Sequence, residues 1–291
     1  MNFIASQNPD GTPVNLYYED WGTGSPVVFI HGWPLDHQMW EHQTRSLPEM
    51  GLRCIAYDRR GFGKSDKPWD GYDYDTFADD LKAVLDQLDL QDVTLVGFSM
   101  GGGEVVRYFS RHGGKRVSKV VLLASITPFT LQTQSNPQGV PMEVLHEMIG
   151  NIQEDRASFL TGFSKMFYGV NLISHQVSQS TLDWNLVLAM QASPKATIDC
   201  IHAFGETDFR TEMHTINVPT LIIHGESDKI VPIEATGEQA ARLIPGSKYI
   251  VYEDAPHGLF VTNKEELNAD LLEFIGAKDI PAKTASNYKS L

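Results

Sequence analysis

The sequence has few cysteines and no long hydrophobic run. Its 291 residues include only Cys54 and Cys200, each in an apolar stretch, so a disulfide scaffold is excluded and two buried thiols are expected. No run approaches the roughly 18 apolar residues of a membrane helix, and no membrane partner is expected. Neither the basic region nor the apolar core of a secretion signal is visible near Met1, which predicts a cytoplasmic location.

Basic residues are also scarce. Lys and Arg number 23 against 37 Asp and Glu, which gives a formal net charge of −14. An acidic surface repels phosphate backbones, so we expect no nucleic-acid partner. Hydrophobic residues make up 42% of the chain, enough for a large core, and a disordered or fibrous chain is therefore excluded.

Short apolar runs alternate with amphipathic stretches, a pattern typical of an α/β fold with a mostly parallel central sheet flanked by helices. An antiparallel edge strand is expected near Asn15–Tyr18, after a turn at Asp10–Gly11. Helical spacing of apolar residues appears around 77–88, 105–109 and 267–275. Buried strands are predicted at Val27–Ile30, Cys54–Tyr57, Thr94–Val96, Lys119–Ala124, Thr220–Ile223 and Tyr249–Tyr252.

The strand pattern stops between residues 127 and 214. Helical spacing there, with many aromatic and Met residues, predicts a helical cap inserted between two strands and lying over the carboxyl edge of the sheet. The core is then expected to comprise residues 1–126 and 215–276. Residues 277–291 lack apolar periodicity and are predicted to form a flexible tail.

Residues 97–101 read GFSMG, a G-x-S-x-G pattern between a predicted buried strand and a predicted helix. Ser99 therefore falls on a sharp strand-to-helix turn, which needs small neighbours on both sides and exposes the serine hydroxyl. A dinucleotide site is the competing use of such a turn. The segment does not fit G-x-G-x-x-G, because Ser99 takes the place of the second glycine.

A catalytic serine needs a histidine base and a carboxylate that orients it. His257 follows a strand on a short loop with Pro and Gly neighbours, and Asp228 follows another strand. Both would meet Ser99 at the carboxyl edge of the sheet. Asp254 and Glu226 are rivals for the acid, but Asp254 is only three residues from His257 and Glu226 would face the other way.

Two backbone amides are expected to stabilise the negative charge on the reacting oxygen. One is the amide of Met100, directly after the serine, and the other is that of Trp33, in the loop after the strand Val27–Ile30. His31 and His224 each end a strand before a glycine and are interpreted as residues that shape loops.

Five motifs in order now indicate a family: HGWPLD (31–36), YDRRGFGKSD (57–66), GFSMGG (97–102), HGESDKIVP (224–232) and DAPHG (254–258). Together they resemble the α/β-hydrolase family, and more narrowly the cofactor-free bacterial aryl esterases and non-haem haloperoxidases (perhydrolases), with γ-lactamases as relatives. The resemblance implies a Ser99–His257–Asp228 triad with Trp33 and Met100 as the oxyanion hole. Epoxide hydrolases and haloalkane dehalogenases share the fold but use an aspartate where this chain has Ser99.

The same resemblance implies a small-molecule ester substrate and an acyl-enzyme that water or hydrogen peroxide resolves. No cofactor and no metal are expected, since the sequence has neither a Cys/His cluster nor an H-E-x-x-H motif. A γ-lactamase or amidase, or a lactonase acting on small cyclic substrates, remains an alternative. A homo-oligomer also stays open, and an intact triad argues against a ligand receptor that has lost catalysis.

Pro34 bears on the choice between water and peroxide. It pushes Trp33 toward extended geometry, which would let the Trp33 carbonyl accept a hydrogen bond from peroxide. A proline after this Trp is similar to the perhydrolase members of the family, whereas esterase members often carry another residue. Alternatively, Pro34 only stiffens the loop. The predicted pocket is apolar and crowded, which favours short acyl groups. Its expected lining is Trp33, Pro34, Phe98, Phe129, Phe163, Phe167, Phe204, Ile230, Val231 and Leu259.

Overall fold

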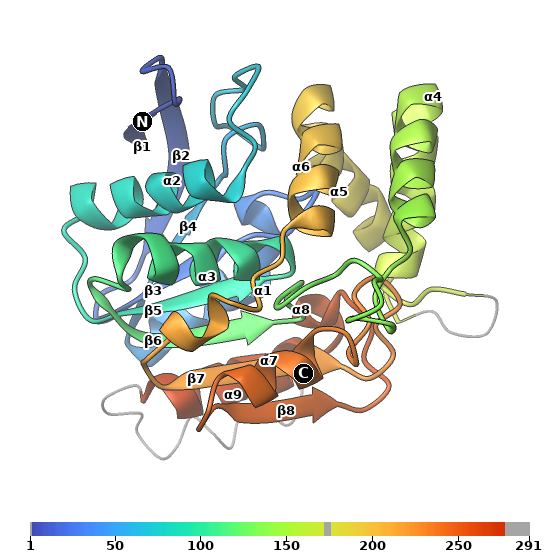
Figure 1. The fold of residues 1–291 in the computed structure, drawn as a ribbon. Helices are drawn as coiled ribbons and strands as arrows, with labels where there is room; N and C mark the ends of the chain where they lie inside the picture. The colour runs from blue at the N-terminus through green and yellow to red at the C-terminus, as the bar shows by residue number, and fades with distance from the viewer. Residues whose placement is uncertain (1, 172–175, 277–291) are drawn as a thin grey trace.

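A computed structural model describes residues 2–171 and 176–276, so the predicted tail at 277–291 lies outside the described residues. Its centre is an eight-stranded sheet in the order β1-β2-β4-β3-β5-β6-β7-β8 (Figure 1). Strands β3 to β8 are parallel, and β1 and β2 are antiparallel to their neighbours. The bounds are β1 Phe3–Gln7, β2 Pro13–Trp21, β3 Ser25–Ile30, β4 Leu52–Tyr57, β5 Val93–Phe98, β6 Val117–Leu123, β7 Thr220–Gly225 and β8 Lys248–Tyr252.

The predicted antiparallel strand near Asn15–Tyr18 exists as β2, but its place at the edge is wrong. Strand β1 pairs with it, for example Ile4 with Leu16, and forms the edge instead. Only Ile4 of the five residues of β1 is fully buried, so the sequence gives almost no strand pattern there. The predicted turn lies between these strands, with the amide of Gly11 donating to the carbonyl of Asn8.

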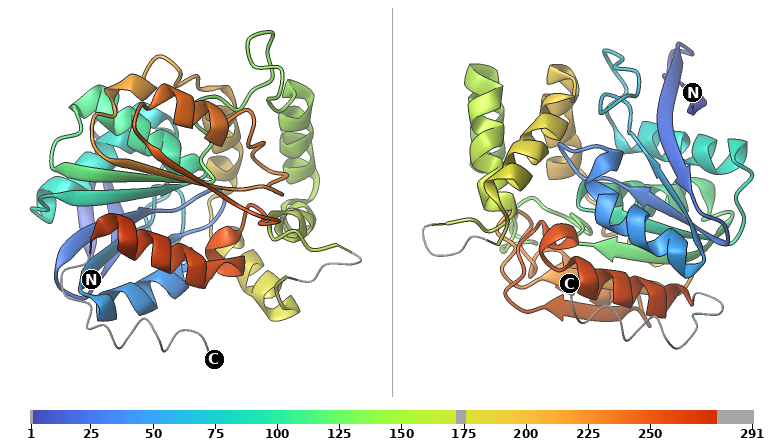
Figure 2. Two further views of the ribbon diagram at one scale, coloured as in Figure 1. Left: turned by 90° about the horizontal axis from the view of Figure 1, so that it is seen from below. Right: turned by 180° about the vertical axis from the view of Figure 1, so that it is seen from behind.

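Helices cover both faces of the sheet (Figure 2). Helices α1 (Glu41–Ser46), α8 (Leu259–Thr262) and α9 (Lys264–Ile275) lie on one face. The other face carries α2 (Tyr74–Gln87), α3 (Met100–His112) and α7 (Gly237–Leu243). The predicted helical spacings fall in α2, α3 and α9. Short 3₁₀ turns lie at His37–Trp40, Leu47–Met50 and Met213–Thr215.

Three α-helices lie in the described part of the predicted insertion, and we call them the cap helices. They are α4 (Met142–Phe167), α5 (Gln179–Met190) and α6 (Pro194–Glu206), between β6 and β7 in the chain and beyond the carboxyl ends of the strands in Figure 1. Helix α4 bends at Asp155, whose φ of −151° and ψ of 89° are not helical. The exact division into core and cap stays a prediction.

Within residues 2–171 and 176–276, no helix combines the length and the apolar character that crossing a bilayer requires.

Candidate active site

Ser99 occupies the turn between β5 and α3. Its φ of 52° and ψ of −117° are a conformation that side-chain-bearing residues rarely adopt, as a sharp strand-to-helix turn requires. A Cβ added to Gly97 would lie 2.6 Å from the carbonyl oxygen of Gly101, and the predicted need for a small residue at 97 is therefore confirmed. The turn leaves the Ser99 side chain at the carboxyl edge of the sheet.

His257 and Asp228 meet Ser99 at this edge. The His257 Nε2 lies 3.0 Å from the Ser99 Oγ, and its Nδ1 donates to the Asp228 Oδ2 at 2.6 Å. The Asp228 Oδ1 accepts the backbone N–H groups of Ile230 and Val231, both at 2.9 Å. These hydrogen bonds fix both oxygens of the carboxylate, so the imidazole is held in one orientation toward the hydroxyl.

The two rival carboxylates lie elsewhere. Glu226 accepts the backbone N–H of Asp254 at 3.3 Å, and both residues are exposed. Asp228 is buried, and burial raises the pKa of its carboxyl. The charge of His257 and the hydrogen bonds from His224 and His257 outweigh that effect and lower the pKa below its ordinary value of 3.8. Asp228 is consequently ionised across the neutral range and is suited to orient His257.

Burial and aromatic packing surround the imidazole of His257. Its ring centroid lies 4.8 Å from that of Phe98 and 4.9 Å from that of Phe167 in α4. The exposed fractions of His257 and Ser99 are only 1% and 6%. Phe98 and Phe167, two of the predicted pocket residues, therefore exclude water from the proton-transfer pair.

The two predicted oxyanion amides lie on segments that meet at Ser99. Met100 is the first residue of α3, so its N–H has no acceptor within the helix. A Cβ added to Gly32 would lie 3.1 Å from the Cβ of Ser99 and 2.6 Å from the ring of Phe98, which places the loop before Trp33 directly against the serine. The Trp33–Pro34 peptide bond is cis.

A family description, "alpha/beta hydrolase fold", matches residues 25–264. The chain belongs to the α/β-hydrolase family. It is 44% identical over 264 residues to the non-heme chloroperoxidase of Kitasatospora aureofaciens, covering 90% of this chain and 96% of that protein. It is 41% identical over 279 residues to the bifunctional esterase/perhydrolase of Acinetobacter calcoaceticus, covering 94% and 99%.

Solved structures of related proteins support the same family. A crystal structure of bromoperoxidase from Bacillus anthracis matches this hydrolase with a TM-score of 0.90 and 46% identity, covering 94% of this chain and 100% of that one. An esterase from Exiguobacterium antarcticum matches with a TM-score of 0.88 and 37% identity, covering 94% and 99%. The predicted resemblance to esterases and non-haem haloperoxidases is confirmed.

Sequence reasoning missed a buried ion pair beneath the site of the hydrolase. The Arg59 Nε donates to the Glu104 Oε2 at 2.8 Å, and the Tyr57 hydroxyl also hydrogen bonds Glu104. The Arg59 Nη2 donates to the carbonyl of His31 at 2.9 Å. Burial, and secondly the Arg59 charge, lowers the pKa of His31 well below its ordinary value. The neutral ring accepts the Arg59 N–H at Nε2 and donates from Nδ1 to the carbonyl of Gly32. This network ties α3 to the loop before Trp33.

A cluster of aromatic rings forms around Trp33. Its indole centroid lies 5.2 Å from Phe163 of α4 and 5.8 Å from Phe204 of α6, and its N–H donates to the carbonyl of Thr197 at 3.0 Å. Trp33 thus joins the loop of the predicted oxyanion hole to the cap helices. Three predicted pocket residues are thereby brought together.

The other predicted pocket residues are more scattered. Ile230 and Val231 hold Asp228, and Leu259 is fully buried at the start of α8. Phe129 lies under the guanidinium of Arg210, 4.9 Å from its carbon, and among the described rings none is in contact with it. Its role in the pocket has the least support from the structure.

One buried cluster in the described part of the chain has the residue types of a metal site. Ligand atoms of Asp36, His37 and Asp58 lie within 4.8 Å of one another. They already have partners: the Asp58 Oδ1 accepts from the backbone and Nδ1 of His37, and its Oδ2 accepts from the backbone of Lys64. A cation would have to displace these hydrogen bonds, so the cluster is explained as the structural support of two loops.

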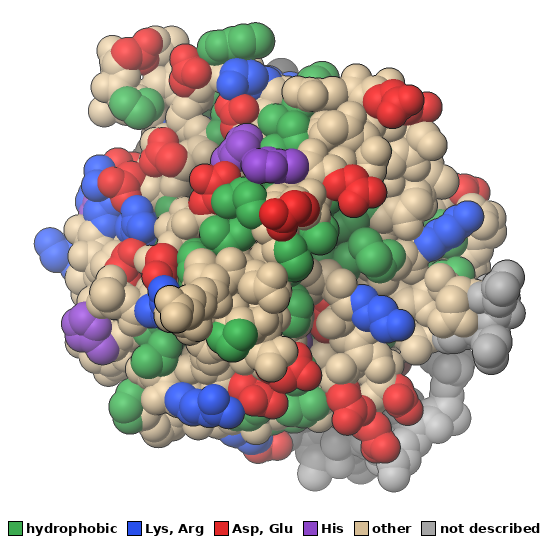
Figure 3. All heavy atoms as spheres, turned by 45° about the vertical axis from the view of Figure 1, so that its right-hand side comes forward, with side chains coloured by type: hydrophobic (Ala, Val, Ile, Leu, Met, Phe, Trp, Pro, Cys, Tyr) green, Lys and Arg blue, Asp and Glu red, His purple; other side chains and the backbone are tan. Residues whose placement is uncertain are grey.

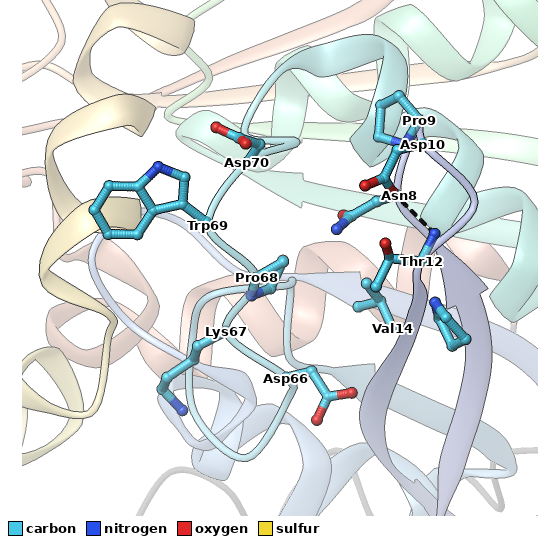
Figure 4. A pocket seen from close by; sticks show the side chains of 11 residues that line it. Asn8, Pro9, Asp10, Thr12, Val14, Asp66, Lys67, Pro68, Trp69 and Asp70 are labelled. Carbon is cyan, nitrogen blue, oxygen red and sulfur yellow. Dashed lines mark hydrogen bonds between the residues drawn. The ribbon is translucent and has the colours of Figure 1, made fainter.

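Acidic side chains are spread over the face shown in Figure 3, in keeping with the net charge. A surface pocket of about 570 Å³ lies between the β1–β2 hairpin and residues 66–70 and contains none of the triad residues (Figure 4). Trp69 at its rim has the Nζ of Lys195 in α6 over its ring at 5.2 Å. This contact connects the rim of the pocket to the cap helices.

Proposed function

We propose that this protein is a serine hydrolase of small carboxylic esters that also transfers the acyl group to hydrogen peroxide. The hydrogen-bonded chain from Ser99 Oγ through His257 to Asp228 is the observation that carries the proposal. The names of the esterase/perhydrolase and chloroperoxidase relatives support it. The predicted cytoplasmic location and the oligomeric state stay predictions.

The reaction follows from the geometry. His257 takes the proton of Ser99 at Nε2 while the Oγ attacks the ester carbonyl, and Asp228 stabilises the imidazolium that forms. The amides of Met100 and Trp33 donate to the oxygen that becomes negative. His257 then gives its proton to the leaving alcohol, the carbon–oxygen bond breaks, and an acyl ester of Ser99 remains.

Water or hydrogen peroxide completes the cycle. His257 takes a proton from the incoming molecule, its oxygen bonds to the acyl carbon, and Ser99 leaves and recovers the proton. Water yields a carboxylic acid, whereas peroxide yields a peracid. A released peracid oxidises halide in solution, so halogenation needs no metal at this site.

A panel of esters with and without peroxide tests the proposal. We expect p-nitrophenyl acetate to be hydrolysed faster than p-nitrophenyl decanoate, because the rings around Trp33 leave little room for a long chain. Adding hydrogen peroxide and bromide should produce halogenation of monochlorodimedone only when a short ester or acid is present. The same panel carries a γ-lactam and a lactone for the alternative substrates. Decanoate turning over faster would contradict the small pocket, and no ester turnover at all would overturn the function.

Pro34→Leu tests the contribution of the loop to the choice of nucleophile. We expect the ratio of perhydrolysis to hydrolysis of the acetyl-enzyme to fall, because Pro34 constrains the Trp33 carbonyl that would accept a hydrogen bond from peroxide. Peracid and acid formed from one ester are measured side by side. Pro245→Leu, at an exposed proline in the turn between α7 and β8, is the matched control. An unchanged ratio in Pro34→Leu would show that this proline only stiffens the loop.

A further inference from the structure

A second histidine lies behind the triad. His224 is in β7, is fully buried, and was interpreted from the sequence only as a residue that shapes a loop. Its Nε2 lies 3.0 Å from the carbonyl oxygen of Val231 and 3.3 Å from the Oδ2 of Asp228. That Oδ2 is the same oxygen that accepts from His257. His224 and His257 therefore approach one carboxylate from two sides.

The tautomer of His224 follows from its neighbours. Both groups near Nε2 are acceptors, a carbonyl and a carboxylate oxygen, so Nε2 carries the hydrogen and donates. Nδ1 has no hydrogen-bond partner in the described part of the chain. A hydrogen on Nδ1 would thus be buried without an acceptor, and the ring is set to donate from Nε2 alone.

Packing holds the ring in this orientation. A Cβ added to Gly237, the first residue of α7, would lie 2.7 Å from Nδ1 and 3.1 Å from Cγ of His224. The backbone of α7 therefore fills the side of the ring opposite Asp228. A ring in this position has no room to turn away from the carboxylate.

Val231 closes the arrangement. Its backbone N–H donates to the Asp228 Oδ1 at 2.9 Å, while its carbonyl accepts from His224. His224 consequently holds both the carboxylate and the loop that binds the carboxylate. Without this imidazole, the Asp228 Oδ2 would keep the His257 N–H as its remaining side-chain donor among these groups, and the Val231 carbonyl would lose its hydrogen bond from β7.

We propose that His224 is a positioning residue for catalysis: its Nε2–H is shared between Val231 and Asp228 and keeps the Asp228 carboxylate aligned with His257. The inference rests on the proposed function, because it acts through the triad. It touches no substrate, so its removal should lower kcat and leave KM unchanged. A small misplacement of reacting groups can cost up to about 100-fold in rate.

Three variants test this role. His224→Leu removes the donor at similar volume; His224→Gln places an amide N–H near the position of Nε2; His224→Asn carries an amide too short to reach Asp228. With p-nitrophenyl acetate we expect Leu and Asn to lower kcat by about 10-fold to 100-fold with KM within about twofold. Gln should recover most of that loss. If Leu fails to fold, the comparison of Gln with Asn decides.

Asp228→Asn supplies the control for simple structural damage. If His224 acts through the carboxylate, adding His224→Leu to Asp228→Asn should lower kcat by less than about twofold further. Equal kcat in Gln and Asn variants, or the full His224→Leu loss recurring in the Asp228→Asn background, would overturn the inference. Wild-type turnover and labelling of Ser99 by a fluorophosphonate report separately on the proposed function.

Discussion

Ser99→Ala is expected to lower kcat for p-nitrophenyl acetate by about 10⁴-fold or more, the usual cost of removing a triad nucleophile. The Ser99 Oγ is the one atom to which the acyl group would be bonded, and His257 Nε2 stands 3.0 Å from it. Both hydrolysis and perhydrolysis pass through this acyl-enzyme, so both should fall together. Steady-state rates with and without peroxide measure the loss.

The control for this variant lies on the same helix. Ser110→Ala removes an exposed hydroxyl near the other end of α3 and should leave kcat within about twofold of the wild type, as for most surface changes. A fluorophosphonate should add mass to the wild type and to Ser110→Ala but not to Ser99→Ala. Substantial turnover by Ser99→Ala, with the mass still added, would mean that another residue is the nucleophile.

Glu104→Ala is expected to lower the free energy of unfolding by about 3–5 kcal/mol, because it leaves the Arg59 guanidinium buried without its counter-charge. Both side chains of this pair are fully buried. Denaturation in urea at neutral pH measures the change. The Arg59 Nη2 also holds the carbonyl of His31, so the loop before Trp33 should loosen as well.

An exposed ion pair provides the comparison. Lys248 and Glu273 lie 2.9 Å apart, with side chains 47% and 72% exposed, and Glu273→Ala should cost no more than about 1 kcal/mol. A loss for Glu104→Ala as small as that for Glu273→Ala would show that Arg59 finds another partner. It would also remove the argument that this pair anchors the loop.

The parallel strands could be predicted because each is a short run with uninterrupted apolar faces. Val27–Ile30 and Thr220–Ile223 lie within β3 and β7 as observed. Strand β1 could not be predicted, because it buries only one side chain and is formed through its pairing with β2. The evidence for this strand lies in the sequence of β2, with which it pairs, and not in the residues of β1.

Part of the candidate site could likewise be predicted from the sequence, and part of it could not. Ser99, His257 and Asp228 each follow a strand within a local motif, so their meeting could be expected from the common edge of the sheet. The role of Arg59 depends on contacts with the distant residues His31 and Glu104, and buried charges resemble surface charges in a sequence. The role of His224 depends on how the loop after β7 folds back onto this strand, which the residue types alone do not show. Only the packing of β4, β7 and α3 shows which polar residues are inside.

Strands β6 and β7 are hydrogen-bonded neighbours, with Leu123 opposite Ile223, although the cap helices separate them in the chain. The chain therefore leaves the sheet after β6, forms the cap helices, and returns to the sheet as the adjacent strand β7. Exchanging the cap helices for the equivalent stretch of another family member would therefore change the rings of Phe163, Phe167 and Phe204, which pack on Trp33 and His257, and leave the pairing of β6 with β7 in place.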